Sequence, residues 1–219
     1  LGAERAGKSC LIKRYCEDRF VEKYKGTIGV DYGVKPLHLG GAEVRVNLFD
    51  LAGGDDFRAV RMEFYRDAQG LLLVYDAGER ASFEALERWA REAEEGGAPG
   101  GAPVVVVANK AERPVAVTEA EGREWAEGRG WAFFEASAAT GEGVRYVFAT
   151  LFLRILEFAP GVPDHVVAAA SAAVLQEGVG RGRGSWVRAG GGLSTGAAGT
   201  GSGGGGRRPS LLKNSTRAY

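Results

Sequence analysis

Apolar and polar positions along the first 158 residues of the chain follow two different periods. Apolar residues recur at helical spacing in several segments, which predicts helices over 8–20, 83–93 and 144–156 and a further helix opened by the capping box Thr118-Glu-Ala-Glu121. Between them, apolar residues alternate with polar ones or run unbroken, which predicts strands over 30–39, 43–50, 70–76, 103–109 and 131–136. Strands and helices therefore alternate along the chain.

The order of these elements defines the expected fold class. The runs over 70–76 and 103–109 are apolar throughout, which is typical of parallel strands covered on both faces. Gly40-Gly41 joins the first two strands as a hairpin, and Pro36 restricts the first of them to a sheet edge. We therefore predict an α/β fold with a mostly parallel sheet, one antiparallel edge strand and helices on both faces.

The last quarter of the chain has a different composition. From Pro160 onward it is rich in Gly, Ala, Ser and Arg, with four consecutive glycines at 203–206. Such a segment buries too little apolar surface to offset the entropy of ordering it. An Ala-rich run over 162–177 favours a short helix, but isolated helices of this length are marginal in water. We expect a folded domain over 1–158 and a disordered Gly/Ala/Arg-rich tail over 159–219.

Charge and cysteine content exclude several classes of protein. The 28 basic and 28 acidic side chains cancel, so no net charge attracts nucleic acid. Two cysteines, Cys10 and Cys16, do not make a disulfide framework and favour a reducing compartment. No apolar run approaches the roughly 18 residues of a membrane span. We expect an intracellular protein, cytoplasmic or nuclear, without a nucleic-acid partner.

The segment Gly2-Ala-Glu-Arg-Ala-Gly7-Lys8-Ser9 has the spacing of a P-loop, which places the expected fold among the P-loop NTPases. Its glycines let backbone amides turn toward a polyphosphate, and the following helix adds the positive end of its dipole. Lys8 would reach the outer phosphates and the Ser9 hydroxyl would bind Mg²⁺. A Gly-rich turn with a solvated lysine is the alternative, but the segment directly opens a periodic helix, which favours the phosphate site.

A buried strand normally precedes a P-loop, and here Leu1 alone stands before Gly2. We therefore expect the first strand of the domain to be missing, that is, an N-terminally truncated domain. Such a strand contributes on the order of 10 kcal/mol by burying apolar side chains. Because this is comparable with the net stability of a whole domain, we expect the chain as written to fold poorly.

Four further motifs lie at predicted strand ends or in loops on the side of the P-loop. They contain Thr27, Asp50-Leu-Ala-Gly53, Asn109-Lys-Ala-Glu112 and Glu135-Ala-Ser-Ala138. Each alone has a structural explanation, as loop filler, helix cap or turn residue; together and in this order they favour a nucleotide site. With the P-loop, they make residues 1–158 resemble a Ras-superfamily small GTPase, of the Rab-like branch through Thr27-Ile-Gly-Val-Asp-Tyr32. The chain also resembles a Rab-like group whose GTPase domain is followed by a J domain. A J domain contains a His-Pro-Asp triplet, and this chain lacks that triplet.

The resemblance implies GTP or GDP with Mg²⁺ as ligands. It places at the nucleotide Gly2, Glu4, Arg5, Ala6, Gly7, Lys8, Ser9, Cys10, Thr27, Asp50, Gly53, Asn109, Lys110, Glu112, Ser137, Ala138 and Ala139. Ser9, Thr27 and, through a water, Asp50 would hold the metal. The segments around Thr27 and Gly53 would be two switches that respond to the terminal phosphate and are read by effector and regulator proteins. A monomer is expected.

Several residues depart from the family pattern. Gly54 stands at the position of the water-orienting Gln, so hydrolysis should be slow and no catalytic residue is assigned with certainty. Asp55 or Asp56 could replace it, but a terminal phosphate would repel a carboxylate, which favours solvated turn residues. Glu4 should weaken phosphate binding and obstruct an arginine finger. Glu112 is one methylene longer than the Asp that reads guanine, which should weaken guanine preference.

Two functions remain open on these grounds. The first is a guanine-nucleotide switch with weak GTP hydrolysis, acting in signalling or trafficking; the alternative is a degenerate pseudo-GTPase scaffold that does not cycle. An ATP-using enzyme is disfavoured because it has no use for Asn109-Lys110 or Ser137-Ala138. Arg217-Ala-Tyr219 contains no cysteine for prenylation, so no lipid anchor of the Rab kind is expected.

Overall fold

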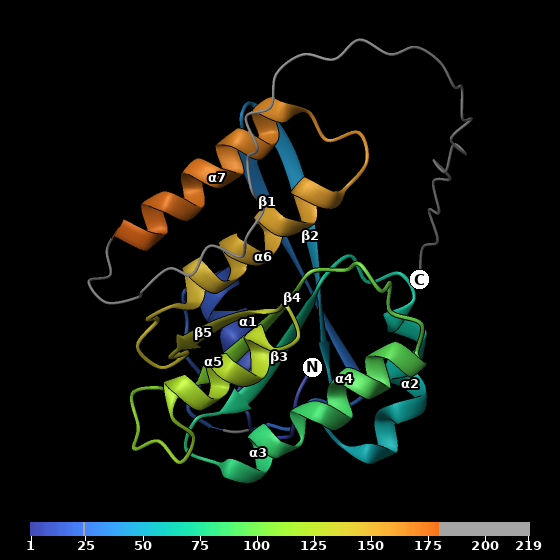
Figure 1. Cartoon of the computed structure of the whole chain (residues 1–219), viewed down its shortest axis with the longest axis vertical. Helices are drawn as coiled ribbons and strands as arrows, with labels where there is room; N and C mark the ends of the chain where they lie inside the picture. The colour runs from blue at the N-terminus through green and yellow to red at the C-terminus, as the bar shows by residue number, and fades with distance from the viewer. Residues whose placement is uncertain (24, 180–219) are drawn as a thin grey trace. The chain divides into compact units, whose positions relative to one another are not determined.

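The computed structural model describes residues 1–23 and 25–179 (Figure 1). The elements, in chain order, are α1 (Lys8–Glu17), β1 (Val30–Leu39), β2 (Ala42–Leu51), a 3-10 turn η1 (Asp55–Phe57), α2 (Arg58–Tyr65), β3 (Leu71–Asp76), α3 (Arg80–Glu84), α4 (Leu86–Glu95), β4 (Val104–Asn109), α5 (Glu119–Glu127), β5 (Ala132–Ala136), α6 (Val144–Phe158) and α7 (Asp164–Val179). Every predicted strand and helix is present with small shifts of its ends, except that the helix predicted over 83–93 is divided into α3 and α4 at Ala85. The α/β fold class is confirmed, whereas α2 was not predicted.

The described strands form two sheets. β3, β4 and β5 pair in parallel in that order, and β1 and β2 form a separate antiparallel pair. Gly40 and Gly41, with φ of 57° and 83°, make the tight turn of this hairpin, as their sequence predicts. The hairpin is thus its own two-stranded sheet rather than a hydrogen-bonded edge of the parallel one.

Leu1 lies beside β3 as a residue of a neighbouring strand would. Its backbone nitrogen donates to Leu72 O at 2.6 Å, and Val74 N donates to Leu1 O at 2.8 Å. The Leu1 side chain packs against a small apolar cluster that includes Leu51 of β2 and Tyr65 of α2. This one residue therefore occupies the strand position expected before the P-loop.

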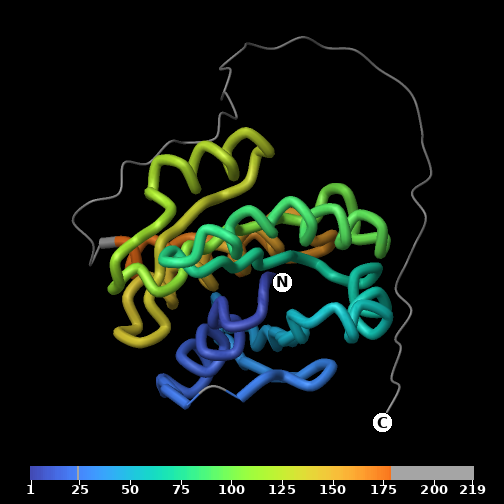
Figure 2. The backbone as a smooth tube through the Cα atoms, turned by 90° about the horizontal axis from the view of Figure 1, so that it is seen from below, coloured from blue at the N-terminus to red at the C-terminus, as the bar shows by residue number. Residues whose placement is uncertain are grey.

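The parallel sheet is covered on both faces, which explains its unbroken apolar strands. Val74, Val105 and Val107 share a cluster with residues of α1 and α6, whereas Leu73 and Val106 share another with residues of α3, α4 and α5. Figure 2 shows α1 in blue and α3 and α4 in green on opposite sides. The chain thereby places the carboxyl ends of its parallel strands next to the start of α1.

Helix α7 lies within the segment for which we expected disorder. Its Val166 and Ala170 are buried against Leu156 of α6, together with residues of the β1–β2 hairpin. Figure 1 shows α7 beside α6 and this hairpin. A Cβ at Gly40 would lie 2.7 Å from His165 O, so the hairpin turn touches the start of α7. The expectation of disorder is corrected for 164–179, because the Ala-rich run finds an apolar partner that its own sequence does not reveal. The rest of the predicted tail, 180–219, lies outside the described residues.

Within the described part of the chain, no helix combines the length and apolar character needed to cross a membrane.

Candidate nucleotide-binding site

The P-loop turns sharply into the start of α1. A Cβ at Gly2 would overlap Val74 O, and one at Gly7 would overlap the amide nitrogen of Asn109, so both positions require glycine. Gly7 also has a φ of 95°, in the left-handed region. No described side chain caps α1 at this end, and its first turn contains no acidic residue. The first amides of α1 are therefore suited to binding an anion.

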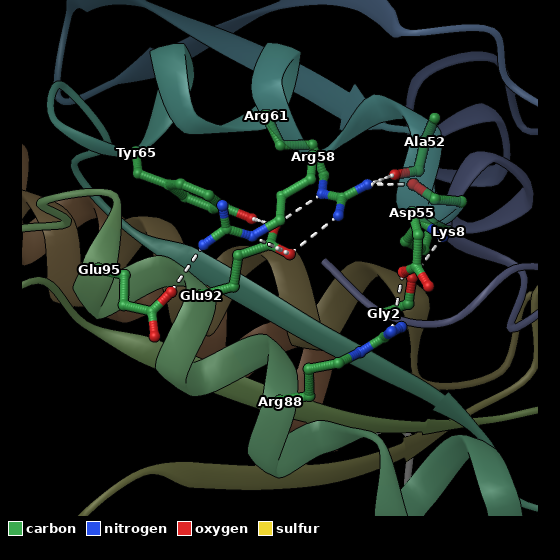
Figure 3. A network of polar contacts seen from close by, with 11 residues as sticks. Gly2, Lys8, Ala52, Asp55, Arg58, Arg61, Tyr65, Arg88, Glu92 and Glu95 are labelled. Carbon is green, nitrogen blue, oxygen red and sulfur yellow. Dashed lines mark hydrogen bonds and ion pairs between the residues drawn. The ribbon is translucent and has the colours of Figure 1, made fainter.

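Lys8 lies across this loop. Its Nζ donates to Gly2 O at 2.8 Å and to Ala3 O at 2.9 Å (Figure 3). Burial lowers the pKa of Lys8 from its usual 10.5 to about 8, although the carboxylates of Asp50 and Glu4 act in the opposite direction. A polyphosphate would supply the negative charge that this buried cation lacks.

Three predicted metal ligands meet beside Lys8. Ser9 Oγ lies 3.0 Å from Thr27 Oγ1, which in turn donates to Asp50 Oδ2 at 3.3 Å. Asp50 is buried, and its Oδ1 has no hydrogen-bond partner among the described residues. Hydroxyl and carboxylate oxygens are the hard ligands that Mg²⁺ prefers, and they leave coordination positions for phosphate and water. The residues present therefore fit a nucleotide-bound Mg²⁺.

Asn109, at the end of β4, ties the P-loop to the loop after β5. It is 1% exposed; its Nδ2 donates to Ala6 O at 2.8 Å, and its Oδ1 accepts from Ala138 N at 3.2 Å. Arg14 of α1 donates from the other side to Ala138 O and to Ala139 O, at 2.9 and 2.6 Å. The structure thus brings together the P-loop and the two loops predicted to surround guanine.

Other predicted base-site residues also lie on these loops. Lys110 has a φ of 64°, and its Nζ binds Asp76 Oδ2 at 2.6 Å. Ser137 Oγ accepts from Thr140 N at 3.0 Å, and Glu112 lies 3.7 Å from Arg113 Nε. The sequence analysis did not include Asp76. It ends an apolar strand as Asn109 does, so the same strand-end rule could have found it.

Gly53 and Gly54 lie against the P-loop. A Cβ at Gly53 would lie 2.6 Å from Glu4 N, and one at Gly54 would lie 2.8 Å from Glu4 Oε1. Asp55 forms an exposed ion pair with Arg88 of α4, in which Arg88 Nη1 donates to Asp55 Oδ1 at 2.8 Å. The carboxylate of Glu4 therefore occupies the space next to Gly54.

A buried ion pair that the sequence analysis missed holds this turn to α4. Arg61 of α2 is 1% exposed and binds Glu92 through Nε at 2.7 Å and Nη2 at 2.9 Å. Its Nη1 donates to Ala52 O at 2.9 Å and to Gly54 O at 2.6 Å, and the Tyr65 hydroxyl donates to Glu92 at 2.6 Å (Figure 3). An arginine four residues before a tyrosine on one helix face was the available signal.

The charge state of this pair follows from its contacts. Burial opposes ionisation of Glu92, but hydrogen bonds from Arg61 and Tyr65 outweigh it and hold the pKa of Glu92 below its usual 4.5. Removing one partner of such a buried pair costs about 3–5 kcal/mol. A single hydrogen bond from an amide to a charged group contributes less, about 1.5–3 kcal/mol.

The fold and the site define a class of protein. The sequence model of the Ras family matches residues 1–157, and the chain belongs to this family. Members of the family generally bind guanine nucleotide and Mg²⁺. The resemblance expected from the motifs is therefore confirmed.

The chain is also similar to proteins named DnaJ homolog subfamily C member 27. It is 48% identical over 163 residues to the Homo sapiens protein, covering 72% of this chain and 60% of that protein. It is 44% identical over 183 residues to the Mus musculus protein, covering 81% and 67%. For the Danio rerio protein the identity is 48% over 163 residues, covering 72% and 60%. The chain thus spans 60 to 67% of the length of these relatives.

Proposed function

We propose that the chain is a Mg²⁺-dependent guanine-nucleotide switch that hydrolyses GTP slowly. Its membership of the Ras family supports a GTP-binding switch in general. The observation that carries the proposal is the meeting of Ser9, Thr27 and Asp50 beside Lys8, at the uncapped start of α1.

Each group has a defined role in this proposal. Lys8 and the first amides of α1 hold the phosphates. The hydroxyls of Ser9 and Thr27, with Asp50 acting through a water, hold Mg²⁺, which neutralises charge on the phosphates when it is bound. The amide of Gly53 contacts the terminal phosphate, so the segments around Thr27 and Gly53 are both placed to sense it.

The remaining predicted residues surround the base. Asn109 ends β4 and Lys110 follows it, and Ser137, Ala138 and Ala139 follow β5. The two hydrogen bonds of the Asn109 amide support this assignment, because they fix both loops against the P-loop. Glu112 reads guanine less well than an aspartate would, since its carboxylate is displaced by one methylene.

Slow hydrolysis follows from Gly54 and Glu4. Gly54 has no side chain to orient the attacking water. The carboxylate of Glu4 lies where a side chain at residue 54 would begin and repels both hydroxide and a terminal phosphate. The same observation favours the second candidate, a pseudo-GTPase scaffold whose surface does not change with nucleotide.

We assign effector and regulator binding to an exposed aromatic row beside the switch segments. Tyr32 of β1 and Phe49 of β2 are 54% and 48% exposed, with ring centroids 5.2 Å apart, and Phe64 of α2 follows at 5.1 Å. Exposed aromatic rings of this kind are typical of protein interfaces. We place this Rab-like signalling or trafficking protein inside the cell as a monomer, where free thiols such as those of Cys10 and Cys16 persist.

Nucleotide titration of the full chain tests the proposal. We expect fluorescent GDP and GTP to bind in the presence of Mg²⁺, ATP to bind more weakly, and Lys8→Ala to abolish binding. Lys13→Ala, further along α1, is the matched control. Equal affinity for ATP, or no binding at all, contradicts the switch, and partner binding that survives Lys8→Ala favours the scaffold.

A further inference from the structure

We propose that Arg61 is a positioning residue for the terminal phosphate: anchored on Glu92, it holds the turn 52–54 in its phosphate-facing arrangement before the nucleotide binds. This inference rests on the proposed nucleotide site and deepens it. It gives a function to the buried Arg61–Glu92 ion pair, neither residue of which is among the predicted nucleotide contacts.

The geometry centres on the two carbonyl groups around Gly53. Arg61 Nη1 donates to Ala52 O and to Gly54 O, which belong to the residues on either side of Gly53. Gly53 itself packs so closely on the P-loop that a Cβ there would lie 2.6 Å from Glu4 N. One nitrogen atom therefore fixes both neighbours of the glycine whose amide is assigned to the phosphate (Figure 3).

The anchor of this arrangement is rigid. Glu92 belongs to α4, which packs on β3, and Tyr65 adds a third hydrogen bond to its carboxylate. The Arg61 guanidinium also lies 4.8 Å from the centroid of the buried Trp89 ring. Four hydrogen bonds and this cation–π contact specify one position for the guanidinium, so the turn is held by α4 rather than by the ligand.

The relative strengths of the interactions determine the behaviour of the turn. Releasing it would break both hydrogen bonds from the buried guanidinium to Ala52 O and Gly54 O, and two hydrogen bonds to a charged group contribute more than one amide–phosphate contact does. Loss of the terminal phosphate therefore does not free this turn. The segment around Thr27 is then the part that moves between nucleotide states, which differs from the expectation that both segments are released.

Comparing two nucleotides separates positioning from a purely structural role. A pair that only stabilises the fold would affect triphosphate and diphosphate binding alike. A pair that orients the Gly53 amide affects the triphosphate alone, because the diphosphate does not reach that amide. The ratio of the two affinities is therefore the informative readout.

The experiment uses the full chain with Mg²⁺, fluorescent GDP and a non-hydrolysable fluorescent GTP analogue. We expect Arg61→Lys and Glu92→Gln to lower the analogue-to-GDP affinity ratio about tenfold with little change for GDP. Arg88→Ala is the matched control, because Arg88 also joins α4 to this loop through Asp55, but in an exposed ion pair. We expect it to leave the ratio unchanged within twofold.

The outcomes separate this inference from the proposed function. An unchanged ratio in both variants, or equal weakening of both nucleotides, overturns the inference while the nucleotide site stands. Wild-type protein that binds neither nucleotide overturns the proposed function and the inference with it.

Amide hydrogen exchange of the wild type decides the matter if the variants fail to fold and bind no GDP. Slow exchange across α2, 58–65, that is equal in the GDP and analogue complexes supports the inference. Exchange about tenfold faster in the GDP complex overturns it, because the turn would then be released with the terminal phosphate.

Discussion

The carboxylate of Glu4 lies beside Gly54, with Glu4 Oε1 2.8 Å from the point where a Cβ at residue 54 would begin. The two departures from the Ras pattern are therefore one structural feature rather than two. In this arrangement the Glu4 carboxylate occupies space that a side chain at residue 54 would otherwise use. A polar side chain introduced at residue 54 while Glu4 remains would place two polar side chains in a single space.

The first prediction concerns this coupling. We expect Gly54→Gln alone to raise single-turnover GTP hydrolysis less than threefold, because the glutamine is displaced by Glu4. Gly54→Gln combined with Glu4→Ser should raise it by about tenfold or more, since the amide can then orient water. Phosphate release from preloaded protein measures both rates. A single variant as fast as the double variant would show that the two residues act independently.

The second prediction concerns Asn109. Asn109→Ala removes two hydrogen bonds that join the P-loop to the loop after β5, and it leaves Ala6 O without this donor. We expect a loss of about 1–3 kcal/mol in unfolding free energy and weaker binding of GDP. Thermal melting and GDP titration measure the two effects. Asn47→Ala removes only an exposed hydrogen bond with Tyr32 and serves as the control; equal effects of the two substitutions would contradict the role of Asn109.

The third prediction concerns acid stability. The pKa of Glu92 is lower in the folded protein than its usual 4.5, so ionised Glu92 stabilises the fold above that value. This contribution is lost as the pH falls through the folded pKa, below 4.5. We expect Glu92→Gln to destabilise the protein by about 3 kcal/mol near pH 6 and by less near pH 3. Denaturant unfolding at both values tests this, and a difference that grows on acidification would refute it.

Local sequence patterns were sufficient for most elements, and they also indicated the residues of the candidate site. Both faces of β3 and β4 are covered, so these strands are unbroken apolar runs. Polar residues of the candidate site lie at the ends of β2, β4 and β5, namely Asp50, Asn109 and Ser137. Each of these polar residues lies at or next to the end of its own strand, so each signal is local in the chain. For Asn109 and Ser137 they predict that the side chains lie close together, because β4 and β5 are parallel and end at the same edge of their sheet.

Contacts between distant segments were not predictable in the same way. Arg61 and Glu92 are 31 residues apart, and each alone has the pattern of an ordinary charged residue on a helix. The helix α7 is stable because Val166 and Ala170 meet α6, a partner that helix propensity does not reveal. The separation of the two sheets likewise depends on pairing, which the period of a strand does not specify.

The fourth prediction tests whether α7 is part of the folded domain. Val166 is 3% exposed, so Val166→Asp places a charge in the contact with α6 and should cost about 2–4 kcal/mol of unfolding free energy. Leu175 is 66% exposed on the same helix, and Leu175→Asp should have little effect. Thermal melting of the full chain measures both. Equal melting temperatures for the two variants would show that residues 164–179 are not part of the folded domain.

The fifth prediction concerns the choice of base. Glu112 follows β4 in the loop that begins at Asn109, and its carboxylate lies 3.7 Å from Arg113 Nε. Glu112→Asp shortens the side chain by one methylene, which returns the carboxylate to the reach at which both oxygens accept from guanine. Because a good bidentate contact with a base contributes about 1–3 kcal/mol, we expect GDP to gain roughly tenfold over ADP. Competition titrations with the two diphosphates measure this ratio, with Glu127→Asp on α5 as the control. A ratio that does not rise would mean that Glu112 already reaches the base and that the loop has adjusted to its length.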